Sequence, residues 1–504
     1  MDSQQMMETS IVTGGMGTVL FYLYTKSDTE TEVAVLGYLA CSFLMILLHQ
    51  AAPLFHVNPV KKTEGIYRSI NSQGLWSSFL IPTICVLGNF ITKTDDKIDS
   101  SLLFVLLTLT LTLVHYNPSN ASQIAGALLL LWLKEIFKQQ GSSSIQLCVF
   151  NSIMFYSTLS KLPQKFPMSF SYGESIIVLQ STLLIVTQFL FRTSILQENE
   201  EEINTVSDHA MIKIAMLAIL GVFLASVLLH LIREYTSKLK FYIVYSLVIG
   251  VFLIFGLPRQ NPIVILVEYF SGNLIRFYLV TWYGSLTAIT VMYMLLHSKQ
   301  TSVSTATRKF FHVIIVAVYI PGLLLDPTFL TTASLLAFCV MCVIETLRHM
   351  DVQPFGRLIE EKYKLFLDKQ DEGPLALTPI YLIFGLSLPL WMSFIFRIPV
   401  SDISVYAGVI SVGIGDAVAS VIGSKIGRVK WPGSSKTVEG SLASLVSQIV
   451  TLYCLQYTGK VESSWTFITL IAVTITTVLE AVTTQIDNLV LPLFLYTILL
   501  LNML

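Results

Sequence analysis

Apolar stretches long enough to cross a lipid bilayer recur along this 504-residue chain, and they limit its fold more than any other feature. A transmembrane helix needs roughly 20 consecutive apolar residues. Only 12% of the residues are charged and 54% are hydrophobic, whereas soluble domains carry about 25% charged residues. The sequence therefore predicts an all-α, polytopic transmembrane bundle of roughly 13 to 17 spans with short loops. The clearest stretches are residues 33–48, 102–114, 175–191, 211–231, 241–257, 313–325, 328–344, 374–396, 403–422, 440–455, 465–479 and 489–504.

The remaining composition excludes some functions. The net charge of −1 implies no bulk attraction to nucleic acid. Cys339 and Cys342 form a Cys-x-x-Cys inside a predicted span and have no second pair, which favours packing over a metal or redox role. The polar N-terminus lacks the basic residues of a signal peptide, so no cleavage is expected.

The chain divides into two regions by chemistry. Residues 1–300 are mostly apolar spans with thin loops, and they predict an N-terminal multi-span membrane region of unknown role. Charged and glycine-rich clusters recur beside the spans of residues 301–504, which we interpret as the catalytic membrane region. The longest polar segment, 346–373, predicts a cytosolic loop with an amphipathic helix along the bilayer surface.

Charge alone yields a topological argument for this second region. Short loops rich in lysine and arginine stay in the cytosol, and residues 299–309, 346–373 and 425–436 are such loops. Two predicted spans separate each loop from the next, and two more lead to the acidic segment 480–488. Even numbers of crossings place all four segments on one face of the membrane, where a single site can form.

The strongest candidate site follows the span that contains Asp416. A carboxylate inside an apolar helix is costly, and by default it indicates function. The glycine-rich loop after that helix carries Lys430 and Lys436, and such a loop can bring backbone N–H groups and cations to phosphate oxygens. Glu439 follows and could share a divalent ion with Asp416. The alternative is that the glycines only pack helices and that the cations only obey the charge rule; for the glycines alone we favour packing.

Three weaker clusters lie on the same predicted face. Each also has a structural explanation: interfacial basic residues for the first, a helix-end charge pair for the second, and a boundary between two spans for the third. In the third, the carboxylates stand seven residues apart, which predicts a shared helix face. The clusters are Arg308, Lys309 and His312; Glu345, Arg348 and His349; and Glu480 with Asp487.

The familiar phosphate-binding motifs, including the P-loop, the protein-kinase set and the Rossmann fingerprint, are absent from the sequence. The chain instead resembles the polyprenol kinase family of CTP-dependent membrane lipid kinases, and its dolichol-phosphorylating members most closely. Three runs carry the resemblance: GD-x-x-A-S-x-x-G at 415–423 with KWPGSSKTVEGS at 430–441, RK-x-FH at 308–312, and EA…DN at 480–488. It covers about the last 200 residues.

The resemblance implies transfer of the CTP γ-phosphoryl group to the terminal hydroxyl of dolichol at a cytosolic site of the endoplasmic reticulum membrane. Asp416, Glu439 and Asp487 would hold a divalent cation, Mg²⁺ or Ca²⁺. A carboxylate or His312 would accept the proton of the alcohol. Besides Arg308 and Lys309, the implied CTP-binding residues are Lys430, Trp431, Pro432, Gly433, Ser434, Ser435, Lys436, Thr437, Val438, Glu439, Gly440 and Ser441.

Other functions stay open at this point. A related kinase could act on phytol, farnesol or diacylglycerol. Phosphatidate cytidylyltransferases share a similar S-x-K-T-x-E-G element, but the downstream Lys-Arg/Lys-Asp and Asp-Arg signature of that family is missing after Gly440. A transporter of lipid phosphates would also hold charged residues in its spans, yet it would need no nucleotide.

Overall fold

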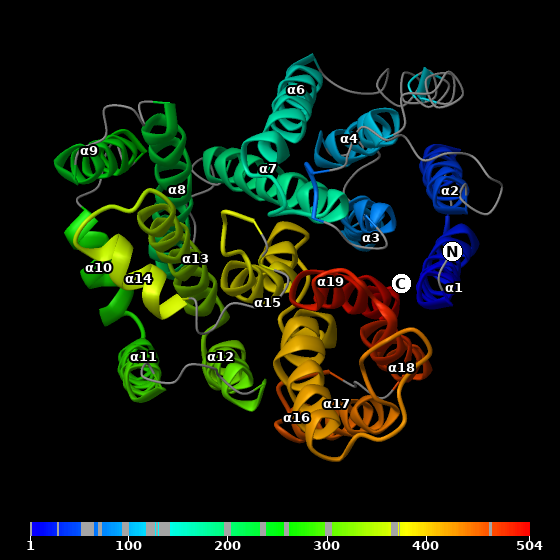
Figure 1. The fold of residues 1–504 in the computed structure, drawn as a ribbon. Helices are drawn as coiled ribbons and strands as arrows, with labels where there is room; N and C mark the ends of the chain where they lie inside the picture. Colours follow the sequence, from blue (N-terminus) through cyan, green and yellow to red (C-terminus); the bar gives the residue numbers. More distant parts are fainter. Residues whose placement is uncertain are drawn as a thin grey trace. The chain divides into compact units, whose positions relative to one another are not determined.

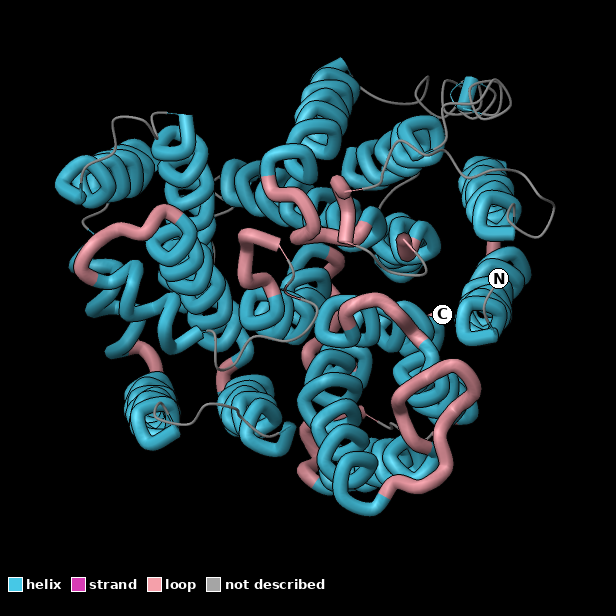
Figure 2. The backbone as a smooth tube through the Cα atoms, viewed as in Figure 1, coloured by secondary structure: helices cyan, strands magenta, loops and turns pink. Residues whose placement is uncertain are grey.

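The fold is helical throughout the part of the chain that is described (Figure 2). The computed structural model describes residues 3–27, 30–51, 65–68, 73–92, 100–116, 126–127, 130, 142–195, 203–231, 238–256, 262–297, 305–363, 371, 373–462 and 466–504. Within these residues, β pairing is confined to an isolated bridge between Lys430 and Thr437. The predicted all-α class is confirmed. Residues 299–304 of the first basic loop and residues 364–370 of the polar segment lie outside the described residues.

The chain forms two compact units, and both draw on distant parts of the sequence. Unit 1 joins residues 1–185 to 388–504, and unit 2 spans 186–371 with 375–387. The boundary at residue 300 that the chemistry indicated therefore falls inside unit 2. Unit 1 contains α1 (Ser3–Lys26), α2 (Glu30–Ala51), η3 (Leu75–Phe79), α3 (Leu80–Thr92), α4 (Ser100–Tyr116), α6 (Ser142–Lys165), most of α7 (Tyr172–Ile195), η6 (Ile403–Tyr406), η7 (Val409–Asp416), α16 (Ala417–Ile426), α17 (Val438–Tyr457), α18 (Phe467–Val482), α19 (Asp487–Leu499) and η8 (Leu500–Met503). Unit 2 contains α8 (Ile203–Leu231), α9 (Lys238–Gly256), α10 (Pro262–Ser271), α11 (Ile275–His297), α12 (Thr305–Leu325), α13 (Pro327–His349) and α14 (Phe355–Tyr363), and α15 (Thr378–Ile395) runs from unit 2 into unit 1.

Each apolar stretch predicted from the sequence coincides with a helix or with consecutive helical turns. Among the described residues, six helices are long and apolar enough to cross a membrane, and seven shorter apolar helices accompany them. A helix satisfies all of its interior backbone hydrogen bonds within one segment, which is what a bilayer without water requires. The short amphipathic helix expected in the polar segment is α14.

Unit 1 is built around α19, whose residues from Asn488 to Leu499 are all buried. Helices α3 and α18 and the turns η6 and η7 pack against it. In Figure 1 the C-terminal helices α16, α17, α18 and α19, drawn in orange to red, group with one another. Helix α17, in contrast, exposes Leu442, Val446 and Val450. An apolar face without a protein partner is the expected surface toward lipid.

Unit 2 is held together by a buried arginine as well as by apolar packing. The guanidinium of Arg276 lies 2.7 Å from the Asp326 carboxylate and 2.7 Å from that of Asp208. It also stacks on the Tyr269 ring at 3.9 Å. Asp326 caps the N-terminus of α13 by accepting a hydrogen bond from Phe329 N–H. The acceptors around this arginine offset the cost of burying its charge.

Candidate active site

The glycine-rich loop folds as a tight hairpin between α16 and α17. Ser434 N–H donates to the Trp431 carbonyl at 3.1 Å, and Trp431 N–H donates to the Lys436 carbonyl at 3.0 Å. Pro432 and Gly433 occupy the two central positions of the turn, and Gly433 has a φ of 74°. A type II turn favours proline first and requires positive φ at the second position, which glycine adopts without strain. The sequence of the loop therefore determines its local shape.

Glycines at the base of the hairpin let α16 and α17 approach closely. A Cβ added to Gly440 would lie 2.7 Å from the Ala419 carbonyl oxygen, and one added to Gly423 would lie 2.8 Å from Thr437 Oγ1. The Thr437 hydroxyl caps α17 by accepting from Gly440 N–H at 3.3 Å. The packing interpretation of these glycines is thus supported.

The Lys436 side chain extends from the hairpin into a cluster of carboxylates. Its Nζ lies 2.6 Å from Glu480 Oε1 and 3.5 Å from Asp487 Oδ2, and it also donates to the Glu480 carbonyl at 2.7 Å. Glu480 stands two residues before the end of α18, and Asp487 is the first residue of α19. An ammonium ion is therefore enclosed by acceptors from two helices.

Asp416 completes the cluster. It is 3% exposed and stands where the π-helical turn η7 passes into α16. One carboxylate oxygen from each of Asp416, Glu480 and Asp487 lies within 4.8 Å of the other two. Single π-helical turns inside longer helices occur frequently at functional sites. We call Asp416, Lys436, Glu480 and Asp487 the carboxylate–lysine cluster.

The electrostatic balance of this cluster keeps Lys436 charged. Burial alone would lower the pKa of the lysine, but the negative charges of Glu480, Asp487 and Asp416 outweigh that effect. The pKa of Lys436 is consequently raised above its usual 10.5. The lysine is a fixed cation that can pair with carboxylates or with phosphate oxygens.

The three carboxylates also suit a divalent cation. Oxygen-only ligation at this spacing is what Mg²⁺ and Ca²⁺ prefer, and the donors come from three different helical segments. Three negative charges facing one lysine leave a surplus of negative charge that a bound cation would neutralise. The three oxygens therefore fit a divalent cation, and the binding of Mg²⁺ or Ca²⁺ by this protein stays a prediction.

Glu439, predicted as a ligand of that metal, is not among the three clustered carboxylates. Its carboxylate instead accepts a hydrogen bond from Val429 N–H, which lies 3.1 Å from one oxygen and 3.2 Å from the other. This contact stabilises the hairpin. The role of Glu439 as a metal ligand stays a prediction. Glu480, which sequence reasoning left out of the metal set, occupies the corresponding place. The sequence feature that pointed to Glu480 is an acidic residue that interrupts an apolar run, seven residues before Asp487.

Glu480 and Asp487 do not share one helix face, so this prediction was wrong. Helix α18 ends at Val482 and α19 begins at Asp487, so a break in the helix separates the two residues. The carboxylates converge because both helix ends point at Lys436. The candidate site thus lies at the boundary between two spans.

The two other predicted clusters lie in unit 2 and are described by themselves. Lys309 and the buried His312 stand near the start of α12, while the side chain of Arg308 lies outside the described residues. Glu345 pairs with Arg348 at 2.6 Å and accepts from Ala376 N–H at 2.8 Å, which supports a structural charge pair. The participation of these residues in the site stays a prediction.

Comparison with known proteins identifies the family of the chain. A family profile described as dolichol kinase matches residues 100–384, which is more than half of the chain. The chain belongs to the dolichol kinase family. The match includes much of the N-terminal region whose role the sequence left open, and the carboxylate–lysine cluster lies beyond its end. No solved structure matches the chain.

Individual dolichol kinases agree with the family assignment. The chain is 31% identical over 358 residues to the dolichol kinase of Mus musculus, an alignment that covers 66% of this chain and 65% of the mouse protein. It is 33% identical over 248 residues to that of Arabidopsis thaliana, covering 48% of this chain and 43% of the plant protein. It is 33% identical over 239 residues to that of Saccharomyces cerevisiae, covering 47% and 44%. The chain thus spans slightly less than two thirds of the mammalian relatives it matches.

Proposed function

We propose that this protein transfers the γ-phosphoryl group of CTP to the terminal hydroxyl of dolichol, producing dolichyl phosphate and CDP. The observation that carries the proposal is the position of Lys436, which extends from a glycine-rich turn into a cluster of three carboxylates. Phosphoryl transfer requires positioning and charge neutralisation more than covalent chemistry. A cation-bearing turn beside a metal-type carboxylate set supplies both.

The residues of the cluster divide the work between them. Lys430 and Lys436, with the backbone N–H groups of the turn, bind the phosphates of CTP. Asp416, Glu480 and Asp487 would hold the divalent cation, which when bound neutralises charge on the transferring phosphoryl group. Before the nucleotide binds, Lys436 stabilises the same carboxylates and keeps their charges from repelling one another.

The proton of the alcohol needs an acceptor. A carboxylate of the cluster is the candidate that the geometry favours, because it lies beside the lysine that binds phosphate. His312, the alternative from the sequence, is buried on α12 in unit 2. His312→Gln tests this choice: it should retain most of kcat if a carboxylate of the cluster accepts the proton, and it should lose kcat if His312 is the base.

Membrane and cellular location follow from the substrate. Dolichol is dissolved in lipid and CTP is dissolved in the cytosol, so the site has to lie near the cytosolic surface of the bilayer. The basic loop of residues 425–436 supports that orientation, because short loops rich in lysine and arginine stay in the cytosol. The family assignment supports the endoplasmic reticulum membrane as the location in this proposal.

A transfer assay on membranes that contain the protein tests the proposal. Radiolabel from [γ-³²P]CTP should enter dolichyl phosphate, should do so poorly from ATP, and should vanish with a chelator or in Asp416→Asn. Label transfer to phytol or diacylglycerol in preference to dolichol would identify a related lipid kinase instead. Release of pyrophosphate with formation of a CDP-lipid would identify a cytidylyltransferase. Failure to bind CTP at all would favour a transporter.

A further inference from the structure

The two acidic residues of the cluster that lie in the C-terminal helices are joined by a very short linker. Residues 483–486 connect the end of α18, which carries Glu480, to the start of α19, which carries Asp487. Thr483, Gln485 and Ile486 are buried. With so few residues between them, any shift of the linker moves both carboxylates relative to Lys436.

The first helix of the chain binds one end of this linker. Gln4 Nε2 donates to the Val482 carbonyl at 3.0 Å, and the Thr483 hydroxyl donates to Glu8 Oε1 at 2.8 Å. The same Glu8 oxygen accepts from the Trp76 indole at 3.2 Å. Glu8 is 1% exposed, so these hydrogen bonds replace the water that its carboxylate has lost.

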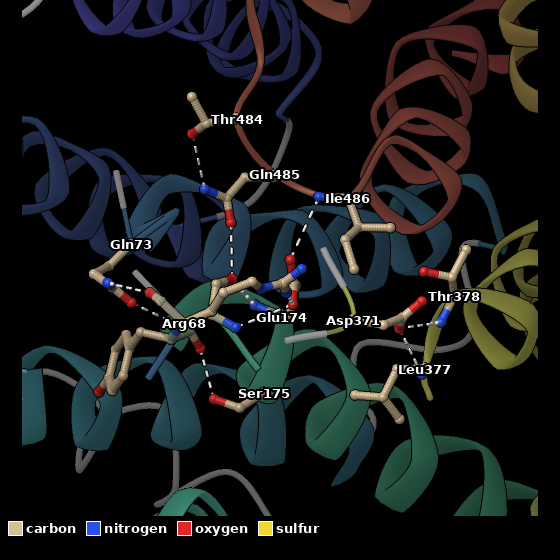
Figure 3. A network of polar contacts seen from close by, with 12 residues as sticks. Arg68, Gln73, Glu174, Ser175, Asp371, Leu377, Thr378, Thr484, Gln485 and Ile486 are labelled. Carbon is tan, nitrogen blue, oxygen red and sulfur yellow. Dashed lines mark hydrogen bonds and ion pairs between the residues drawn. The ribbon is translucent and has the colours of Figure 1, made fainter. Parts of the chain in front are cut away.

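The start of α7 binds the other end. The Ser171 hydroxyl donates to Gln485 Oε1 at 2.8 Å, and Ile486 N–H donates to Glu174 Oε1 at 3.4 Å (Figure 3). Glu174 is in turn held by an ion pair with Arg68 and by Ser171 N–H at 3.0 Å. Both partners of the ion pair are almost fully buried. A buried network in which each acceptor has donors is rigid and specifies one geometry.

The backbone around Gly74 shows how closely this network encloses the linker. Gly74 has a φ of 67°, a conformation that favours glycine, and a Cβ at this position would overlap the side-chain amide of Gln485. Gly173 N–H donates to the Gln73 carbonyl at 2.9 Å, which ties this turn to α7. Three segments of the N-terminal region therefore converge on the linker between Glu480 and Asp487: α1, the turn at Gly74 and residues 171–174.

We propose that the N-terminal region sets the geometry of the carboxylate–lysine cluster, with Ser171, Glu174, Arg68 and Glu8 as positioning residues. Among the described contacts they do not touch the cluster; they hold the linker that joins the two helices carrying Glu480 and Asp487. Residues that orient metal-binding carboxylates influence metal affinity by about 10- to 100-fold. The inference rests on the proposed function for its catalytic meaning, but its consequence for cation binding can be measured separately.

Binding of Mn²⁺ to the purified full-length protein in detergent, followed by electron paramagnetic resonance, tests the inference without any turnover. Ser171→Ala and Gln485→Met each remove one side of the hydrogen bond to the linker, and each should raise the Kd for Mn²⁺ by about 10-fold. Ser175→Ala is the matched control. The Ser175 hydroxyl is buried in the first turn of α7 and donates only to the Tyr172 carbonyl, so the Kd of this variant for Mn²⁺ should equal that of the wild type.

A second pair of variants separates positioning from simple loss of stability. Glu8→Gln keeps an oxygen that can accept from Thr483 and Trp76, and it should retain Mn²⁺ affinity. Glu8→Leu removes the acceptor and should not. If Ser171→Ala binds Mn²⁺ like the wild type, whatever its melting temperature, the inference is overturned; it is equally overturned if the wild type binds no Mn²⁺. If the wild type binds Mn²⁺ but transfers no phosphate from CTP, the proposed function fails while the positioning role stands.

Discussion

The ammonium group of Lys436 lies 2.6 Å from the carboxylate of Glu480, although 44 residues separate the two in the sequence. This pair links the glycine-rich hairpin to the end of α18. It also explains how a carboxylate can persist in a largely apolar bundle, since a buried charge is stable only beside an opposite charge or hydrogen-bond donors.

Removal of the Glu480 carboxylate should impair cation binding, and removal of the Glu439 carboxylate should not. Glu480→Gln withdraws one of three clustered oxygens and the partner of Lys436, so we expect kcat to fall by about 100-fold and excess Mg²⁺ to restore part of it. Glu439→Gln keeps an oxygen that can accept from Val429 N–H, so its kinetics should change little. Steady-state kinetics across a Mg²⁺ titration measure both. Metal rescue of Glu439→Gln and not of Glu480→Gln would return Glu439 to the metal site.

Asp416→Asn should abolish activity and leave the protein inserted and folded. The substitution keeps the shape of the side chain and removes a charge whose burial is costly in a membrane. Insertion is therefore expected to be as good as that of the wild type, while transfer falls by at least about 100-fold. Activity and the amount of folded protein, the latter by size-exclusion chromatography, should be measured on the same preparation. Turnover close to wild type would make Asp416 a structural residue.

The charge of Lys436 should not titrate in the ordinary working range. A lysine whose pKa is raised in the folded state contributes stability that is fully present below the unfolded value of 10.5, and this contribution is lost only as pH rises through the folded value. Between about pH 6 and pH 9, thermal unfolding curves of the wild type and Lys436→Arg should therefore run in parallel. Divergence toward pH 9, with only the wild type losing stability, would show that the lysine is not held charged.

The two ends of α17 should face opposite sides of the membrane. This helix has 20 residues, and at 1.5 Å per residue it spans about 30 Å, the thickness of the hydrocarbon core. In a variant that lacks the six native cysteines, Ser435→Cys should react with an impermeant maleimide from the cytosolic side of sealed microsomes. Lys460→Cys should react only after permeabilisation. Labelling of both without permeabilisation contradicts the orientation that the basic loops predict.

The sequence by itself determined the membrane architecture and much of the site. Apolar length and the cost of unpaired backbone groups in lipid leave helices as the available solution, and each predicted stretch contains helix among its described residues. The cost of a buried charge selected Asp416 and drew attention to Glu480 and Asp487. The Pro432–Gly433 turn is likewise a local property, since its shape depends on the φ preferences of two adjacent residues.

Tertiary structure decided which carboxylate meets which cation. Glu439 is three residues from Lys436 in sequence, but the start of α17 directs its carboxylate to the backbone of Val429. Glu480 is remote in sequence, yet α17 packs against α18 and brings it to the lysine. Glu8 and Ser171 each contact the linker at 483–486, although each lies more than 300 residues before it in the sequence. Such pairings depend on how whole helices pack, and no local pattern of residues encodes that.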